Sequence, residues 1–170
     1  MGQLINCKKA HAVIEKQSPY LAHHSRLADI VAALQVLGTY KFASRKPPEW
    51  EKSIGRAPVS ADSWLQVFSE HPEFFRIRDE WVSLVWRRSS ERVFDTRSGQ
   101  ELQKEAVDAM TDDERKKISR VPLAAEQVTA LIEVAIKLQA QAISRRAELR
   151  WWVPVLIGAI GVAIGALIKS

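Results

Sequence analysis

The sequence predicts a mainly α-helical protein with one small β-hairpin, followed by a long helix and a C-terminal helix that spans a membrane. Three observations support this prediction: an uncharged apolar run near the C-terminal end, apolar residues at helical spacing over much of the chain, and one short hairpin-like stretch of alternating residues. The length of 170 residues fits one modest domain with attachments.

The apolar run from Trp151 to Ile168 contains no charged residue. About 18 apolar residues are enough to cross a hydrocarbon layer of ~30 Å as a helix. Arginine before a span and tryptophan at its start are typical of a membrane interface, and both occur here, at Arg145, Arg146, Arg150, Trp151 and Trp152. A buried core helix is the alternative, but a helix that is apolar on all sides needs a large domain around it. We therefore expect a transmembrane helix over residues 151–168.

Three glycines lie within this expected span, at Gly158, Gly161 and Gly165. Small residues at such spacing let transmembrane helices approach closely, although single glycines are also common in membrane helices that do not associate. The pattern makes the span a candidate contact between two copies of the chain, and a homo-oligomer is the corresponding expectation.

The composition excludes several classes of protein. The net charge of +5 and the pI near 9.5 are basic, but acidic residues are interspersed with basic ones, so no segment carries a dominating positive field. Cys7 is the single cysteine, which excludes an internal disulfide framework and a cysteine-rich zinc site.

Two helices are predicted after an N-terminal helical segment over residues 1–24. Ser25 is placed to cap an amphipathic helix, whose apolar stripe runs from Leu27 to Leu37. Pro48 can open a second, short helix, and Gly55 suits the left-handed position at its end.

A third helix and a hairpin follow. Ser60 is expected to cap a helix over Ala61 to Glu70, with three residues facing the core: Trp64, Leu65 and Phe68. Two short strands, Phe74 to Arg78 and Trp81 to Arg87, are separated by Asp79-Glu80 at hairpin-like spacing.

The second half of the chain is predicted to be helical. Residues 98–122 form a helical connector, with a helix over Glu101 to Met110 and a capping box that begins at Thr111. Residues 123–150 form a long amphipathic helix whose apolar stripe consists of Val128, Leu131, Ile132, Ala135, Leu138 and Ala142. This helix either docks back on the preceding domain or extends the contact between two spans.

Helix, short helix, helix and hairpin follow one another in the order of a winged helix-turn-helix, and we assign residues 25–97 to such a domain. Within it, Ser60 to Leu65 and His71 to Ile77 resemble the third helix and the start of the wing in LOTUS-type winged helices. The resemblance is carried by a helix that ends in a His-Pro pair before a Phe-x-Ile strand.

The run of segments also resembles a group of small, uncharacterised bacterial membrane-anchored proteins. Four motifs carry this resemblance: Ser18 to Leu21, His71 to Phe75, Ile118 to Leu123 and Trp151 to Pro154. It implies a bacterial inner-membrane protein and brings no established activity, and the arginines before the span favour a cytoplasmic location for most of the chain.

Members of that group can carry an N-carbamoyl amino-acid hydrolase label, and a metal-dependent hydrolase needs clustered His, Asp and Glu ligands. Of the four histidines, His23 and His24 are adjacent and would point in different directions, and His11 and His71 have no carboxylate partner at ligand-like spacing; the pattern His-Glu-x-x-His is absent. Cys7 has no evident paired base. We therefore expect a protein that is not an enzyme and holds no metal or cofactor.

Nucleic-acid binding by a winged helix is tested on its third helix and its wing. On the third helix Gln66 can read adenine, but Asp62 and Glu70 repel phosphates. The wing and its neighbours are the better candidate, and they give a predicted binding set of Arg76, Arg78, Arg87, Arg88, Lys41, Arg45 and Lys46. A solvated basic rim or a face that docks a protein is the alternative.

Four tryptophans, Trp50, Trp64, Trp81 and Trp86, are expected in the core, because each supplies much buried area in a small domain. Trp81 is the one for which exposure is also considered.

The sequence thus favours a C-terminally anchored membrane protein that displays a cytoplasmic winged-helix domain as a binding module or adaptor and self-associates. Two alternatives remain open: a membrane-tethered nucleic-acid sensor, and a membrane-perturbing effector activated by oligomerisation. Neither the partner nor the trigger follows from the sequence.

Overall fold

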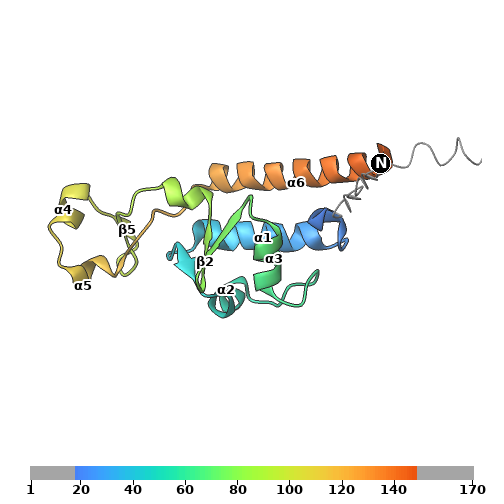
Figure 1. Cartoon of the computed structure of the whole chain (residues 1–170). Helices are drawn as coiled ribbons and strands as arrows, with labels where there is room; N and C mark the ends of the chain where they lie inside the picture. Colours follow the sequence, from blue (N-terminus) through green and yellow to red (C-terminus); the bar gives the residue numbers. More distant parts are fainter. Residues whose placement is uncertain (1–17, 149–170) are drawn as a thin grey trace, which may run out of the picture.

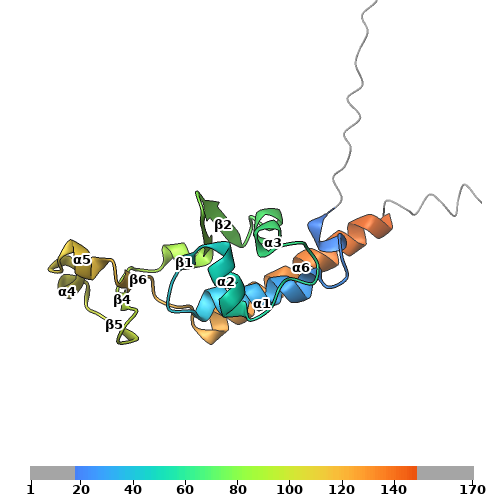
Figure 2. The ribbon, with the colours of Figure 1, turned by 90° about the horizontal axis from the view of Figure 1, so that it is seen from below.

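The computed structural model describes residues 18–148, which are largely helical with two small three-stranded antiparallel sheets (Figure 1). The long helix α6 (Ala125–Glu148) lies along α1 (Arg26–Thr39), and α1 lies between α6 and the short helix α2 (Pro47–Ile54). A lobe of residues 93–119 extends beyond one end of this body in both views (Figures 1 and 2). A short 3₁₀ helix, η1 (Pro19–Leu21), packs near the other end.

Helix α1 has the bounds and the buried stripe that the sequence predicts. It begins directly after Ser25, and Ile30, Leu34 and Leu37 are fully buried. Near its end, the N–H of Leu123 donates to the carbonyl oxygen of Gly38 at 2.9 Å. A Cβ at position 38 would lie only 2.9 Å from a methyl group of Val128, so a glycine is required where α1 meets the start of α6.

Helix α3 (Trp64–Glu70) starts later than predicted, because Ser63 caps it instead of Ser60. The Ser63 hydroxyl accepts the N–H of Gln66 at 3.3 Å. With this start Val67 is buried together with Trp64 and Phe68, whereas Leu65 is exposed, so the inward placement of Leu65 was wrong. In α2, the predicted glycine terminator is confirmed, since Gly55 has φ +83°.

Ser60 instead belongs to a cluster around the buried carboxylate of Asp29. Asp29 accepts hydrogen bonds from the N–H and hydroxyl of Ser60 at 2.8 and 2.6 Å, from the N–H of Val59 at 2.9 Å, and from Arg56 at 2.6 Å. Burial alone raises the pKa of Asp29, but these donors outweigh it and hold the pKa below its usual value. The charged carboxylate thereby anchors on α1 the loop that leads to α3.

The first sheet has the strand order β1-β3-β2, with β1 at Ser44–Arg45, β2 at Phe75–Arg78 and β3 at Trp81–Leu84. The predicted hairpin is confirmed: β2 and β3 pair through a two-residue turn in which Asp79 has φ +56°. The second strand ends at Leu84 and not at Arg87, because the chain turns into a 3₁₀ helix, η2 (Trp86–Ser89).

A second sheet, which the sequence did not indicate, joins the end of the segment assigned to the winged helix to the predicted helical connector. Its strands β4 (Phe94–Asp95), β5 (Gln100–Glu101) and β6 (Ile118–Ser119) have the order β5-β4-β6. Helices are present but shorter than predicted, at α4 (Lys104–Asp108) and α5 (Asp112–Arg115). The capping box before α5 is confirmed: the Glu114 carboxylate accepts the N–H of Thr111 at 2.9 Å.

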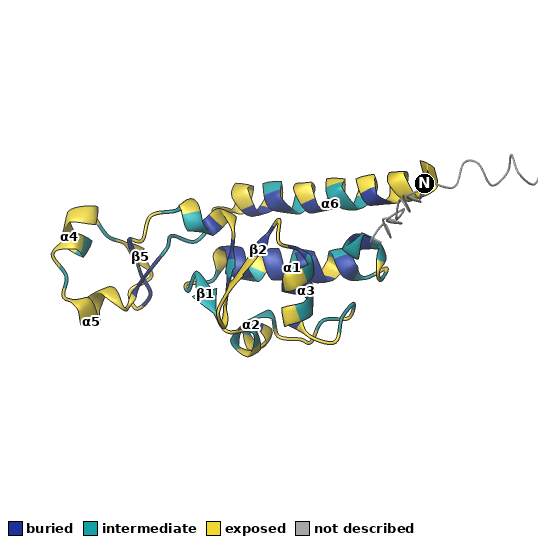
Figure 3. Cartoon of the chain, viewed as in Figure 1, coloured by how far each residue is buried: buried dark blue, intermediate teal, exposed yellow. Residues whose placement is uncertain are grey.

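Helix α6 docks on α1 along its predicted stripe. Val128, Leu131, Ala135 and Ala142 are buried, and Figure 3 shows this face turned toward α1 with the opposite face exposed. The sequence left open whether this helix docks on the preceding domain or extends the contact between two spans. The described residues show docking of α6 on the preceding domain.

Several predictions concern residues that lie outside the described part of the chain. These are the N-terminal helix and the terminal span with its flanking and small residues: Arg150, Trp151, Trp152, Gly158, Gly161 and Gly165. Arg145 and Arg146 are described, and both are exposed in the last turn of α6. Within residues 18–148, no helix is long and apolar enough to cross a membrane.

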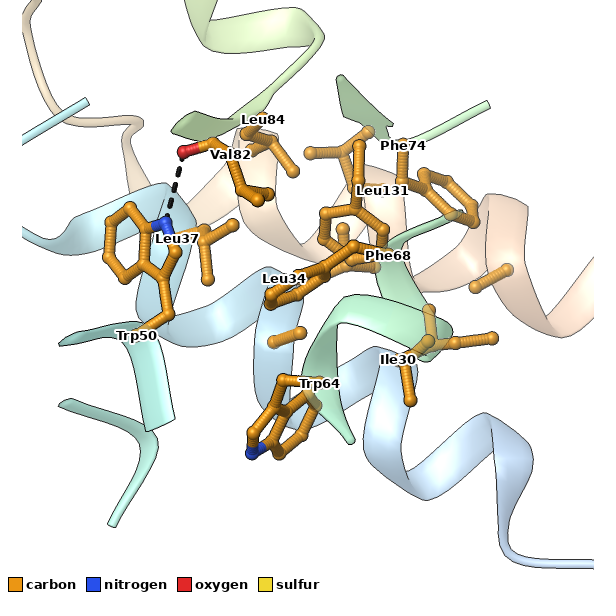
Figure 4. Packing of buried hydrophobic residues seen from close by; sticks show 14 of the residues in the cluster. Ile30, Leu34, Leu37, Trp50, Trp64, Phe68, Phe74, Val82, Leu84 and Leu131 are labelled. Carbon is orange, nitrogen blue, oxygen red and sulfur yellow. Dashed lines mark hydrogen bonds between the residues drawn. The ribbon is translucent and has the colours of Figure 1, made fainter. Parts of the chain in front are cut away.

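One core joins α1, α2, α3, the hairpin and α6 (Figure 4). Trp50 is fully buried, and its indole N–H donates to the carbonyl oxygen of Val82 at 3.0 Å, which ties α2 to the sheet. Trp64 is also buried, as predicted. Trp81 and Trp86 are 47% and 48% exposed, so their assignment to the core was wrong. Trp86 lies outside the core because strand β3 ends at Leu84, before Trp86.

Arg87 is the largest correction to the predicted binding set, because its side chain is fully buried. Its guanidinium donates to the carbonyl oxygens of Leu37 and Phe42 at 3.1 and 3.2 Å, and to those of Arg120 and Val121 at 2.8 and 3.1 Å. Burial lowers the pKa of Arg87 to about 10, so the side chain is still charged at neutral pH. It is a structural clamp between the end of α1 and the segment that leaves the lobe.

We predict that Arg87→Met lowers the free energy of unfolding by about 3–5 kcal/mol, because several buried carbonyl oxygens lose a charged donor. The matched change Arg76→Met, at an exposed position of the same hairpin, should cost less than about 0.5 kcal/mol. Urea unfolding of the full chain in detergent measures both. A loss below about 1 kcal/mol in Arg87→Met would contradict the clamp.

Candidate anion-binding face

The side of the first sheet that faces away from the core carries polar and basic side chains. Residues alternate between faces along a strand, and the register pairs Arg76 with Ser83, Ser83 with Ser44, and Arg78 with Trp81. Phe75, Val82 and Leu84 on the opposite side are buried. We name the outer side, formed by Ser44, Arg76, Arg78, Trp81 and Ser83, the outer sheet face.

Two further arginines lie beside the outer sheet face. The positive charges of Arg76, Arg120 and Arg78, together with partial burial, lower the pKa of Arg88, and Arg76 has the largest effect. These four residues, Arg76, Arg78, Arg88 and Arg120, form what we name the arginine cluster. Within residues 18–148 no carboxylate forms an ion pair with any of them.

The Arg120 side chain lies in the arginine cluster because Arg87 fixes the backbone at the end of the lobe. Arg87 binds the carbonyl oxygen of Arg120, and the Arg120 side chain donates to the carbonyl oxygen of Ser90 at 2.5 Å. One step earlier, the Ser119 hydroxyl accepts the N–H of Ala43 at 3.0 Å, which ties β6 to the segment before β1. Arg120, the residue that follows the lobe, thus adds a cation to the outer sheet face.

A hollow of about 720 Å³ separates the first sheet from the lobe. Its walls include Phe42, Ser44 and Trp81 from the sheet side, and Arg92, Lys116 and Arg120 from the lobe side. A smaller hollow of about 130 Å³, lined by Ser44, Ser83, Arg88 and Arg120, adjoins it. Since Ser44 and Arg120 line both, the large hollow and the arginine cluster form one continuous surface.

The other predicted binding residues are engaged elsewhere. Arg45 pairs with Glu49 at 3.3 Å and lies 5.1 Å from the ring centre of Tyr40, and Lys46 pairs with Glu80. Lys41 is exposed, with its ammonium 5.5 Å from the ring centre of Phe42. Of the predicted set, only Arg76, Arg78 and Arg88 come together as unpaired cations.

Helix α3 carries no basic side chain, and its one charged residue, Glu70, is paired. The Gln66 amide donates to Glu70 at 2.9 Å, so the residue that was expected to read a base is held by a carboxylate. Glu70 also lies 2.7 Å from the buried Arg26, and Asp62 is exposed at the start of the helix. Phosphates would find no basic side chain on this helix, whereas they would meet arginines on the outer sheet face.

Arg120 and Lys116 are the site residues that the sequence did not indicate. Arg120 follows a strand of only two residues, β6, and such a strand is too short to show alternation. The one signal available in the sequence was Trp81, for which exposure was considered as an alternative to burial. An exposed tryptophan beside arginines is unusual in a domain of this size.

Buried polar residues form a separate group that does not open on this face. His71 is fully buried, with Nδ1 3.0 Å from a carboxylate oxygen of Glu73, and that oxygen accepts the hydroxyl of Tyr20 at 2.7 Å. Burial raises the pKa of Tyr20, while hydrogen bonds from His71 and Tyr20 outweigh burial and lower that of Glu73. Among the described residues, no group of three or more His, Cys, Asp or Glu side chains is arranged to hold a metal ion.

Comparison of the chain with protein-family models, curated proteins and solved structures found no match.

We predict that Arg76→Gln and Arg88→Gln each leave the melting temperature unchanged or raise it slightly, because each removes a repulsion and no ion pair. Arg45→Gln is the matched control and should lower the stability by about 1 kcal/mol, since it loses its bonds to Glu49 and Ser53. Thermal unfolding of the three variants measures this difference. A clear destabilisation by Arg88→Gln would show that the cluster has a structural role.

Proposed function

We propose that this chain is a membrane-tethered binding module, in which a winged-helix domain binds a nucleic-acid strand on its wing. The order α1, α2, α3 and hairpin, with β1 paired to β3, supports the winged-helix assignment. The tether is the apolar segment from Trp151 to Ile168, which lies outside the described residues.

The single observation that carries the proposal is the unpaired arginine cluster. Four like charges held close together repel one another, and the pKa of Arg88 is lowered as a result. A chain of phosphates relieves this repulsion, because each phosphate offers oxygens that accept charge-assisted hydrogen bonds from arginine. A folded sheet that holds cations together without a counter-charge is therefore a surface suited to a polyanion.

The distribution of charge also determines which element makes the contact. Helix α3, the helix that a winged helix most often inserts in the major groove, carries no basic side chain for phosphates, and the exposed Asp62 precedes it. The outer sheet face combines arginines with the exposed ring of Trp81, which is the combination that binds single strands through phosphates and base stacking. A single strand is thus favoured over a duplex.

The direction of α6 supports a soluble partner over the lipid surface. With 24 residues, α6 is about 36 Å long. Figures 1 and 2 place the sheet and the lobe toward its N-terminal end, whereas the proposed tether follows its C-terminal end. The arginine cluster then lies well away from the membrane to which the module is anchored.

An adaptor for a protein partner is the second candidate, and a different surface favours it. A groove of about 350 Å³ lies between α2, α3 and the hairpin, and it is lined by the exposed side chains of Leu65 and Ile77 with Pro47 and Pro48. Exposed apolar residues in a groove are typical of contacts with peptides or proteins. This groove is separate from the arginine cluster, so variants distinguish the two candidates.

We predict that the full chain, in phosphatidylcholine nanodiscs, binds a labelled 12-nucleotide single strand with an affinity that falls roughly 20- to 50-fold between 50 and 200 mM salt. This estimate follows from three or four phosphate contacts on a single strand. The triple variant Arg76→Ala, Arg78→Ala and Arg88→Ala should lose most of the binding and most of the salt dependence. Fluorescence anisotropy measures both quantities.

The matched control removes three exposed lysines outside the cluster, in Lys52→Ala, Lys104→Ala and Lys137→Ala, and it changes the net charge equally. It should bind almost as the unchanged chain does. Equal losses in the two triple variants would mean that only net charge matters, and no binding at 50 mM salt would refute the proposed function.

A further inference from the structure

We propose that the hollow between the first sheet and the lobe binds a single nucleotide, with the base against Trp81 and the phosphate between Arg92 and Arg120. The volume of about 720 Å³ lies within the range of roughly 300–1,000 Å³ that is usual for small-molecule sites. The position, at the junction of two parts of the fold, is also one where such sites are common.

The charge of the lining selects an anionic ligand. Arg92, Lys116 and Arg120 face the hollow, and the one carboxylate in its lining, Glu49, is paired with Arg45. Lys116 pairs only with Asp113, and that pair is largely exposed to solvent. The hollow therefore has an excess of positive charge.

The two arginines are held in place and still have free donors. Arg92 donates from Nε to the carbonyl oxygen of Ile118 at 2.8 Å and from Nη2 to that of Arg115 at 2.9 Å, and Nη1 makes no bond among the described residues. Arg120 uses Nη1 on Ser90, which leaves its Nε and Nη2. Fixed guanidinium groups with unused N–H donors suit a phosphate, because little side-chain entropy is lost when it binds.

Trp81 supplies the surface for the base. Trp81 is 47% exposed, on the side of its strand opposite to the fully buried Val82. Base–aromatic stacking contributes about 1–3 kcal/mol per base and accepts any base, because every base has a π-face. Ser44 also lines the hollow, and its hydroxyl makes no side-chain hydrogen bond among the described residues, so it is available to the sugar.

The nucleotide can be a free molecule or one unpaired unit of a strand, and the second case rests on the proposed function. The smaller hollow shares Ser44 and Arg120 with the large one and leads to Arg88. A strand with one nucleotide in the large hollow would place its next phosphates on the arginine cluster. Binding of a strand would therefore depend on Arg76, Arg78 and Arg88, whereas binding of a free nucleotide would not.

The test compares Trp81→Ala and Trp81→Phe with Trp86→Ala in the full chain, again in phosphatidylcholine nanodiscs. Trp86 is the matched control, because it is equally exposed but does not line the hollow. The ligands are the 12-nucleotide strand, a nucleoside monophosphate, the nucleoside without phosphate, and ribose 5-phosphate without a base. Calorimetric titration gives the affinities, and thermal unfolding confirms that each variant is folded.

We expect Trp81→Ala to weaken binding of the strand about 10-fold with an unchanged salt slope, since stacking is not ionic. Trp81→Phe should restore part of the loss, and Trp86→Ala should have no effect. The nucleoside monophosphate should bind more tightly than the nucleoside without phosphate and more tightly than ribose 5-phosphate. An affinity for the strand at least 10-fold above that for the monophosphate identifies a strand as the source, and equal affinities identify the free nucleotide.

The inference is overturned if Trp81→Ala changes the affinity for neither ligand, or if Trp86→Ala weakens binding equally. In that case salt-dependent strand binding through the arginine cluster would still support the proposed function. Conversely, binding of the monophosphate that depends on Trp81, without any binding of the strand, would refute the proposed function and leave the nucleotide site in place.

Discussion

The buried guanidinium of Arg87 is the interaction on which the arrangement of this chain depends. Removing a charge from water is costly, and here carbonyl oxygens from three segments offset that cost: the end of α1, the loop after it, and the two residues that leave the lobe. The carbonyl groups at the C-terminal end of α1 also carry the negative end of its helix dipole. One side chain thereby fixes the sheet, the lobe and the start of α6 relative to one another.

The same clamp creates the candidate site. Because Arg87 binds the backbone of Arg120, the Arg120 side chain lies beside Arg88 and next to the outer sheet face. Arg87 and Arg88 are neighbours in the sequence, yet one is inside and the other meets solvent, since the chain turns through η2 at this point. Unpaired positive charge is concentrated on the hairpin side of the domain, whereas α3 carries no basic side chain.

The sequence predicts the parts of this structure that depend on residues close together along the chain, and it misses those that depend on distant residues. Local signals located α1, α2, the hairpin and α6, because a cap, a proline, a glycine or an apolar stripe acts within a few residues. The burial of Arg87 was not predictable, since its acceptors lie more than 30 positions away along the chain. The second sheet was missed because each of its strands has only two residues. For the site, Arg76, Arg78 and Arg88 followed from alternation and charge, whereas Arg120 required the fold.

The proposed contact of the hairpin and the lobe, and not of α3, with a nucleic-acid strand is tested most directly by cross-linking. A single strand that contains 4-thiouridine is irradiated with the full chain in nanodiscs, and the cross-linked peptides are identified by mass spectrometry. The account predicts cross-links within residues 76–88 and 116–120, with Trp81 among the sites. Cross-links concentrated in residues 62–70, on α3, would contradict it.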